Sequence, residues 1–370
     1  MATITRVEIK MIDLVPKITR TDAIQSFVSQ ETPIVIIHDS DGAVGTGYTY
    51  TIGTGGPAVV SLLERTLAPA LIGKDPTRFE QLWRDLLFQT HATAVGAITS
   101  LALAAIDTAL WDLNCRKNGL PLWKAAGGVR DKMRLYTTEG GWMYFTEDEL
   151  VENALAAKEK GFKGSKIKIG SEYLVQDRRR LTKVREAVGD DYEIMVDANQ
   201  NYDIAQAIRA ARMLDELNIA WFEEPMPADD IAAHVELARR SHVPIAVGES
   251  MYSQSQFKDY MQLGAASIVQ VDVARIGGIT PWLKVAHTAE CFNIAVCPHF
   301  LMELHLPLIC AVPNAKWLEY IPQLDGVTKS QMQVVDGHGI PSREPGLGID
   351  WDWDVISKLE LVHHDVRKAA

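Results

Sequence analysis

Three acidic residues stand at equal intervals along the chain, and each follows an apolar run. Asp197 ends EIMVD, Glu223 ends IAWFE and Glu249 ends PIAVGE, so both intervals are 26 residues long (197 to 223 and 223 to 249). An interval of this length holds one strand, one helix and two short loops. In a barrel of alternating strands and helices, the carboxyl ends of neighbouring strands meet at one mouth. The spacing therefore predicts that the three carboxylates form a cluster.

Such a cluster needs a positive partner, because neighbouring carboxylates disfavour each other's charge. An all-oxygen ligand set suits a hard divalent cation, and Mg²⁺ fits it best. We therefore expect Asp197, Glu223 and Glu249 to bind Mg²⁺. A barrel that served only as an assembly scaffold would have no need of three converging carboxylates.

Two lysines precede this series in the segment SKIKI. Lys166 and Lys168 are two positions apart on a predicted strand, so their side chains point to the same face. Two adjacent ammonium groups are expected to lower the pKa of at least one of them from its usual value of about 10.4. A lysine that is neutral at a working pH of about 7–8 can act as a general base. The alternative is an ordinary strand with two solvated lysines.

Further polar residues end the next predicted strands. Asp272 in VQVDVA and His299 in VCPHF are expected to be neighbours at the barrel mouth. A carboxylate beside an imidazole fixes its tautomer and raises its basicity, which would give a second acid/base group. Glu319 in WLEYI is either a salt-bridge partner at the rim or, if it stays protonated, a hydrogen-bond donor to substrate.

The elements that would carry these residues follow a regular order. From Arg134 onwards, short apolar runs alternate with amphipathic segments such as EDELVENALAAKEKG. This alternation persists through eight predicted strands and favours a parallel barrel over an open sheet. We assign residues 129–322 to this barrel.

The rest of the chain predicts a second, smaller module. RVEIKMIDLV, TPIVIIHDS and DGAVGTGYTY are typical of strands, and helices are expected from Gly56 to about Asn118. Residues 1–128 would form this α+β domain. A Gly/Pro-rich segment, residues 323–370, is expected to return to it and not to add a ninth barrel strand.

Composition narrows the classes of function. The chain has 370 residues and a net charge of −11, which argues against a nucleic-acid partner. Its four cysteines show no CxxC or zinc spacing, and a reducing cytoplasmic location is expected. No signal peptide and no apolar stretch long enough for a bilayer are visible, so we expect no membrane partner.

The series KIK, VDANQ, FEEP, GES, VDVARIGGIT, PHF and WLEY closely resembles the enolase superfamily, specifically its mandelate racemase subgroup. The resemblance covers most of the chain. It implies an α/β fold in which a (β/α)₇β barrel, a modified TIM barrel, carries an N-terminal α+β capping domain completed by the C-terminal tail. It also implies Mg²⁺ chemistry with a Lys or His base, and assembly into a homo-oligomer.

The same resemblance implies a role for each motif residue. The three carboxylates would be the Mg²⁺ ligands. Lys168 would be the base on one face of the substrate, and Lys166 would contact the substrate carboxylate. His299, paired with Asp272, would be the acid/base group on the opposite face. The remaining motif residues are Glu319, which would hydrogen-bond the enolate oxygen, and Asn199, a polar contact to substrate.

Together these residues predict removal of the proton α to a carboxylate through an enediolate. The favoured outcome is dehydration of a sugar acid, such as galactarate or talarate, to a 2-keto-3-deoxy acid. A racemase, an epimerase or a lactone cycloisomerase would use the same site, and a non-catalytic sugar-acid binder is the alternative from another class. Loops of the capping domain would supply polar contacts to a hydroxy-carboxylate, from Thr19, Arg20, Thr21, Tyr48 and Tyr50.

Two further signals receive ordinary structural interpretations. The glycine-rich segment GTGYTYTIGTGGPA lacks the βαβ context of a nucleotide-binding loop, and we expect it to cap the barrel mouth. Met302 and His305 in HFLMELHLPL have helical spacing, which favours core packing over a place in the pocket.

Overall fold

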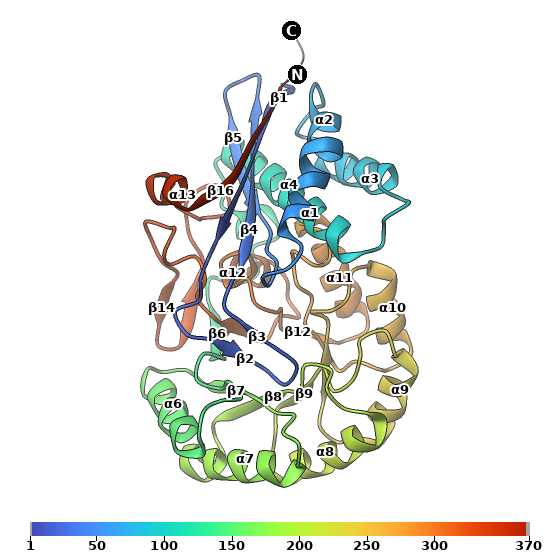
Figure 1. Cartoon of the computed structure of the whole chain (residues 1–370), viewed down its shortest axis with the longest axis vertical. Helices are drawn as coiled ribbons and strands as arrows, with labels where there is room; N and C mark the ends of the chain where they lie inside the picture. Colours follow the sequence, from blue (N-terminus) through green and yellow to red (C-terminus); the bar gives the residue numbers. More distant parts are fainter. Residues whose placement is uncertain (1, 368–370) are drawn as a thin grey trace.

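The computed structural model describes residues 2–367, which form a sheet-and-helix domain beside a barrel (Figure 1). Met1 and residues 368–370 lie outside the described residues. Met1 belongs to the predicted domain of residues 1–128, and residues 368–370 belong to the predicted C-terminal segment 323–370. The sheet-and-helix domain and the barrel occupy opposite ends of the long axis of the molecule. This arrangement is the predicted capping domain and (β/α)₇β barrel.

The capping domain is built on an antiparallel sheet in which strands from both ends of the chain pair. Its strand order is β16-β1-β4-β5. Ile9 of β1 lies opposite Val35 of β4 on one side and His364 of β16 on the other. The prediction that the tail completes this domain is therefore confirmed. The strands are β1 (Ile4–Asp13), β4 (Glu31–Asp39), β5 (Val44–Tyr48) and β16 (Glu360–Arg367).

Helix α4 (Ala97–Lys117) covers this sheet and connects it to the barrel. Its aspartates are buried and accept hydrogen bonds from other elements: Asp107 from the backbone N–H of Thr280 at 2.8 Å, and Asp112 from that of Thr46 at 2.9 Å. Burial raises the pKa of Asp107 to about 7, although the hydrogen bonds that Asp107 accepts from Thr280 oppose the rise. The other helices of the domain are α1 (Gly56–Leu62), the π-helix η1 (Leu63–Leu67), α2 (Ala68–Leu71), α3 (Phe79–Gln89) and α5 (Leu122–Ala125).

Strand β5 lies directly on α4, and glycines make this close approach possible. A Cβ atom on Gly47 would lie 2.2 Å from the backbone nitrogen of Ala109, and one on Gly45 would lie 2.3 Å from the Ala109 carbonyl oxygen. No side chain fits at either position without moving the helix. Within residues 2–367, no helix has the combination of length and apolarity that a membrane span requires.

The barrel contains eight parallel strands within the described residues, each joined to the next through a helix. Hydrogen-bonded neighbours run in chain order from β6 to β12, and β13 pairs with β6. A parallel bridge between Val296 and Ala315 closes the remaining gap. The strands are β6 (Met133–Thr137), β7 (Gly164–Lys168), β8 (Glu193–Asp197), β9 (Trp221–Glu223), β10 (Ile245–Val247), β11 (Ile268–Val269), β12 (Ala295–Val296) and β13 (Leu318–Tyr320).

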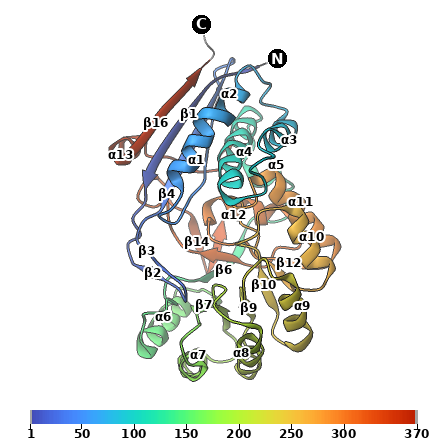
Figure 2. The same ribbon diagram turned by 45° about the vertical axis from the view of Figure 1, so that its right-hand side comes forward.

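Several barrel helices begin where a side chain satisfies one of the first backbone N–H groups. Thr146 forms a capping box with Glu149, and Asp203 forms one with Gln206. Figure 2 shows the helices forming the outer layer around the strands. They are α6 (Glu147–Glu159), α7 (Leu174–Val188), α8 (Ile204–Glu216), α9 (Ile231–Arg240), α10 (Gln254–Gln262), α11 (Ile279–Cys291) and α12 (Met302–Ala311).

The C-terminal segment contains one feature that the sequence prediction omitted. Before helix α13 (Trp353–Leu359), it forms a hairpin of β14 (Gln333–Val335) and β15 (His338–Ile340), and β15 pairs antiparallel with the first residues of β6. Asp336 and Gly337 turn the hairpin with φ values of 47° and 69°. An Asp-Gly pair between apolar residues is a strong hairpin signal, so this element was predictable.

A short hairpin of the capping domain reaches the barrel mouth. It comprises β2 (Arg20–Thr21) and β3 (Ser26–Phe27), and Figure 1 shows it next to β6, β7 and β8. The Arg20 guanidinium donates to Glu139 at 2.8 Å and to the Pro322 carbonyl oxygen at 3.0 Å. The hairpin is thus attached to the loops that follow β6 and β13.

Replacement of Gly47 by alanine is expected to lower the calorimetric thermal midpoint by about 1–4 °C, because overpacking costs about 1–3 kcal/mol. Gly326→Ala is the matched control, since a Cβ at that position meets nothing within 4 Å. Equal midpoints for the two variants would show that β5 does not depend on direct contact with α4.

Candidate active site

The three predicted acidic residues meet at the mouth of the barrel. Asp197 ends β8, Glu223 ends β9 and lies opposite it in register, and Glu249 follows β10 by two residues. One carboxylate oxygen from each lies within 4.8 Å of the other two, and all three residues are buried. Three hard oxygen donors at this separation match the ligand set that Mg²⁺ prefers.

Two of these carboxylates are held by neighbouring donors. Glu223 Oε2 accepts hydrogen bonds from Gln270 Nε2 at 2.7 Å and from Trp221 Nε1 at 3.0 Å. Asp197 Oδ1 accepts one from the backbone N–H of Asn199 at 2.8 Å. Burial raises the pKa of Glu223 to about 7, with Lys166 opposing and Asp197 adding to the rise.

The third carboxylate has a buried oxygen without a hydrogen bond. Glu249 Oε2 accepts none from the described residues, although His299 Nε2 lies 3.3 Å away. A buried carboxylate oxygen without a donor is costly unless a cation compensates it. This oxygen is therefore a direct structural sign that the cluster fits a metal ion.

Gln270 was missed by the sequence prediction. It is almost fully buried and orients one of the metal-binding carboxylates. The signal was its position two residues before Asp272, because alternate residues of an extended segment point to the same face. An amide directed to the barrel mouth could have been inferred from that spacing.

Lys166 and Lys168 both point into the mouth, as their spacing predicts. Lys166 Nζ lies 2.7 Å from Glu223 and 2.8 Å from Glu319, while Lys168 Nζ lies 2.5 Å from Asp197. Lys168 also donates to Asn199 Oδ1 at 3.0 Å. Each ammonium group therefore contacts at least one carboxylate, and Asp197 lies 3.8 Å from Lys166 as well.

These carboxylates decide the pKa of each lysine. Burial lowers the pKa of Lys168, but attraction to Asp197, Glu249 and Glu223 together outweighs it and the pKa lies above its usual value. The pKa of Lys166 is raised well above its usual value for the same reason, through Glu223 and Glu319. The expectation that mutual repulsion lowers a lysine pKa is wrong for these charges, because Lys166 repels Lys168 less than Asp197 attracts it. A divalent cation among the carboxylates would cancel much of that attraction.

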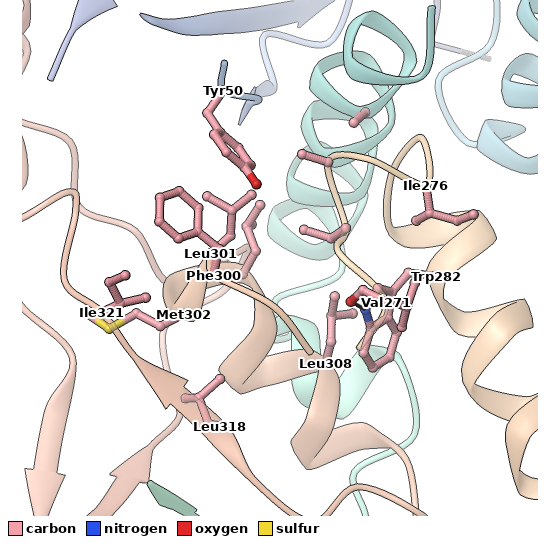
Figure 3. Packing of buried hydrophobic residues seen from close by; sticks show 14 of the residues in the cluster. Tyr50, Val271, Ile276, Trp282, Phe300, Leu301, Met302, Leu308, Leu318 and Ile321 are labelled. Carbon is pink, nitrogen blue, oxygen red and sulfur yellow. Dashed lines mark hydrogen bonds between the residues drawn. The ribbon is translucent and has the colours of Figure 1, made fainter. Parts of the chain in front are cut away.

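His299 and Asp272 are in direct contact across the barrel mouth. His299 Nδ1 lies 2.9 Å from Asp272 Oδ2, and the same oxygen accepts a hydrogen bond from the hydroxyl of Tyr50 at 2.8 Å. Burial lowers the pKa of His299, but Glu249 and Asp272 raise it above its usual value. Tyr50 comes from the capping domain, so this pair is completed by a residue outside the barrel. Figure 3 shows Tyr50 beside Phe300, with ring centroids 4.8 Å apart.

Glu319 is an acceptor in this structure and not a donor. Its Oε1 accepts from the hydroxyl of Thr138 at 2.5 Å, and its Oε2 accepts from the backbone N–H of Phe300 at 2.8 Å. Burial raises its pKa, but Lys166 and His299 lower it more, so that the pKa lies below its usual value. Glu319 would have to be protonated to donate a hydrogen bond to substrate. The charges around it favour the carboxylate form instead.

Two capping-domain residues that the sequence singled out do not themselves line the cavity. Tyr48 is fully buried against Trp351, and its hydroxyl has no hydrogen-bond partner among the described residues. Arg20 is only 4% exposed and is engaged by Glu139 and Pro322. Asn199, by contrast, lines the cavity beside Lys168.

The cavity at the mouth has a volume of about 210 Å³ and is lined by both domains. Lys166, Lys168 and His299 line it from the barrel, and Asp22 and Ile52 line it from the capping domain. The segment that contains Ile52 is the glycine-rich stretch, which therefore lies over the mouth as expected. Met302 and His305 are buried in the core, in agreement with their helical spacing.

Comparison with known proteins agrees with this geometry. Residues 149–355 match the family "Enolase C-terminal domain-like", and residues 6–127 match "Mandelate racemase / muconate lactonizing enzyme, N-terminal domain". The chain is 37% identical over 320 residues to L-talarate/galactarate dehydratase of Salmonella typhimurium, which covers 86% of this chain and 80% of that protein. It is 33% identical over 329 residues to 3,6-anhydro-alpha-L-galactonate cycloisomerase of Streptomyces coelicolor, which covers 88% and 91%.

A solved structure extends the similarity to the metal. L-Talarate dehydratase from Polaromonas sp. JS666, complexed with Mg and L-glucarate, superimposes with a TM-score of 0.94 at 34% identity and covers 100% of both chains. Mg²⁺ is thus bound in a close structural relative, and the cluster of Asp197, Glu223 and Glu249 provides the ligands for it here. This acid-sugar dehydratase-like chain belongs to the mandelate racemase/muconate lactonizing enzyme family of the enolase superfamily.

Proposed function

We propose that this protein dehydrates a sugar acid to a 2-keto-3-deoxy acid by removing the proton α to the carboxylate and expelling the β-hydroxyl. The observation that supports this most is the position of two acid/base groups at different ends of the metal-binding cluster. Lys168 contacts Asp197, and His299 lies next to Glu249. Their strands, β7 and β12, are not neighbours, since β6 and β13 separate them on one side.

In the proposed reaction, each group has one task. Lys168 takes the α-proton, and the electrons of that C–H bond form the enediolate of the substrate. Lys166, held by Glu223 and Glu319, donates a hydrogen bond to the substrate carboxylate. His299 gives a proton from Nε2 to the β-hydroxyl, the C–O bond breaks and water leaves. The resulting enol then tautomerises to the 2-keto acid. Bound Mg²⁺ supplies positive charge that stabilises the carboxylate as its negative charge increases.

Other residues position these groups. Asp272 orients the imidazole of His299 through Nδ1, which leaves Nε2 directed towards Glu249 and the cavity. Asn199 holds Lys168, and Glu319 holds Lys166. Substrate contacts from the capping domain, including Arg20 and Tyr48, stay predictions, and neither residue lines the cavity in this conformation.

A panel of sugar acids tests the proposed function. With Mg²⁺ present, at least one acid is expected to yield a 2-keto acid, detected as the absorbance of its semicarbazone. Exchange of the α-proton with solvent deuterium, without any keto product, would favour a racemase, an epimerase or a cycloisomerase. The similarity to a cycloisomerase supports that second candidate. Binding without exchange or product would indicate a non-catalytic sugar-acid binder.

Removal of the metal is expected to abolish turnover. Exhaustive chelation should eliminate keto-acid formation, and added Mg²⁺ should restore it, because the α-proton is too weakly acidic without added positive charge. Mg²⁺ should also raise the thermal midpoint, by an amount equivalent to about 2.7 kcal/mol at a concentration one hundred times the Kd.

Glu249→Gln should remove this stabilisation by Mg²⁺. Glu186→Gln is the matched control, since Glu186 is exposed on α7 and absent from the cavity lining. Full turnover after exhaustive chelation would contradict the proposed metal dependence.

Substitution of the two acid/base groups should separate proton removal from elimination. Lys168→Ala is expected to abolish both α-proton exchange and keto-acid formation. His299→Asn is expected to lower keto-acid formation by about 10²–10⁴-fold while exchange continues. Deuterium exchange followed by NMR, together with the semicarbazone assay, measures both steps.

Exposed residues of the same types serve as controls for that experiment. Lys163→Ala and His287→Asn should leave both steps unchanged, because the two side chains lie on the protein surface. The opposite pattern, in which His299→Asn abolishes exchange, would assign the base to His299. Unchanged activity in either active-site variant would refute its proposed role.

A further inference from the structure

We propose that Tyr50 of the capping domain is a positioning residue for His299, so that expulsion of the β-hydroxyl, but not removal of the α-proton, depends on the tyrosine hydroxyl. This inference rests on the proposed function and gives a part in it to a residue that does not line the cavity. Tyr50 would thereby decide how often the enediolate loses water instead of regaining a proton.

Tyr50 is held in place by the sheet of the capping domain. It follows β5 by two residues and is 1% exposed. The residues on either side of it, Thr49 and Thr51, donate their backbone N–H groups to the carbonyl oxygens of Pro33 and Glu31 in β4, at 3.0 and 2.8 Å. These hydrogen bonds continue the pairing of β5 with β4, so the backbone of the sheet fixes the position of Tyr50.

The hydroxyl of Tyr50 contacts one oxygen of Asp272. Asp272 Oδ1 accepts hydrogen bonds from the backbone N–H groups of Ala274 at 2.8 Å and Arg275 at 3.1 Å. Asp272 Oδ2 accepts one from the Tyr50 hydroxyl at 2.8 Å and lies 2.9 Å from His299 Nδ1. The carboxylate is therefore oriented from two sides, by its own loop through Oδ1 and by the capping domain through Oδ2.

The contact between His299 Nδ1 and this oxygen selects one of two ring orientations. A half-turn of the imidazole exchanges each nitrogen with a carbon atom, and a C–H group then lies where Nε2 lies now. A ring turned in this way cannot give a proton to the β-hydroxyl from that position. Because the hydrogen bond at Nδ1 opposes the half-turn, displacement of Asp272 Oδ2 would lower the fraction of molecules in which Nε2 can act.

Stacked rings form a second link between Tyr50 and His299. The ring of Phe300 lies 5.3 Å from that of His299, at an interplanar angle of 14°, and 4.8 Å from that of Tyr50. Figure 3 shows the rings of Tyr50 and Phe300 beside each other. The Arg275 guanidinium lies 5.8 Å from the centre of the Tyr50 ring. Tyr50→Phe keeps a ring for these contacts and removes only the hydroxyl, so it isolates the hydrogen bond to Asp272.

The proposed base is held by other residues. Lys168 Nζ lies 2.5 Å from Asp197 and donates to Asn199 at 3.0 Å; Asp197 ends β8, and Asn199 follows it by two residues. Loss of the Tyr50 hydroxyl removes neither contact, so Lys168 should still take the α-proton. An enediolate that is not eliminated then regains a proton from Lys168. Since the lysine can first exchange that proton with solvent, the recovered acid would contain solvent hydrogen at its α-carbon.

The ratio of elimination to exchange tests this role. The acid that gives the most keto product is incubated with Mg²⁺ in heavy water. The semicarbazone assay measures elimination, and NMR of the recovered acid measures exchange. Tyr50→Phe should lower kcat for keto-acid formation about tenfold, because a misplaced catalytic group loses much of its rate, while exchange is retained. KM should not change, because Tyr50 does not line the cavity.

Tyr260→Phe is the matched control. Tyr260 is also buried, and its hydroxyl donates to the carbonyl oxygen of Ala228 at 2.9 Å, but neither residue lines the cavity. This substitution likewise removes a buried hydrogen bond, and the ratio of elimination to exchange should not change. An unchanged ratio in Tyr50→Phe would overturn the inference. Equal loss of both steps would also overturn it, since that pattern indicates a general loss of structure.

Crystallography separates failure of this inference from failure of the proposed function. If no acid yields a keto product, the proposed function fails, and crystal structures of the protein and of Tyr50→Phe, both with Mg²⁺, are then compared. Loss of the contact between His299 Nδ1 and Asp272 Oδ2 in the variant would support the role of Tyr50. The same contact in both structures would overturn it.

Discussion

The mutual repulsion of three buried carboxylates is the constraint on which the active site depends. Two like charges 4 Å apart cost about 4 kcal/mol at an effective dielectric constant of 20, and one carboxylate oxygen from each of Asp197, Glu223 and Glu249 lies within 4.8 Å of the other two. The protein places one cationic or titratable neighbour beside each of them. Lys168 contacts Asp197, Lys166 contacts Glu223, and His299 approaches Glu249. The groups that balance the cluster are the same groups proposed to move protons and bind the substrate carboxylate.

Two kinds of structural support follow from this arrangement. The metal ligands and lysines belong to barrel strands or follow them closely, and the backbone ladder fixes their register; Asp197 lies opposite both Lys168 and Glu223. The capping domain lines the cavity with residues of its β2–β3 hairpin and of the glycine-rich segment, and specific contacts join it to the barrel. One of these contacts, from Tyr50 to Asp272, makes the orientation of His299 dependent on the position of the cap. The groups proposed to move protons and the cap residues that line the cavity thus belong to structurally different parts of the chain.

Much of this could be predicted from the sequence. Equal spacing of acidic residues at the ends of apolar runs predicted the carboxylate cluster, because strand and helix lengths set the distance between successive strand ends. The alternation within KIK predicted that both lysines share a face, and the strand-end positions of Asp272 and His299 predicted their contact. The Asp336-Gly337 hairpin and the orientation of Gln270 were equally local signals, and they were overlooked.

What the sequence determined by itself was which charged residues end the barrel strands at the mouth, since the period of strands and helices carries that information. The tertiary structure decided which of them touch and how they are charged. The pKa values of Lys168 and Glu319 depend on partners from distant strands, through distances that no spacing along the chain encodes. The same holds for the capping domain, where packing turned Arg20 towards Glu139 and left Asp22 facing the cavity. Turns are positioned by contacts with the other domain, and such contacts have no period that a sequence could display.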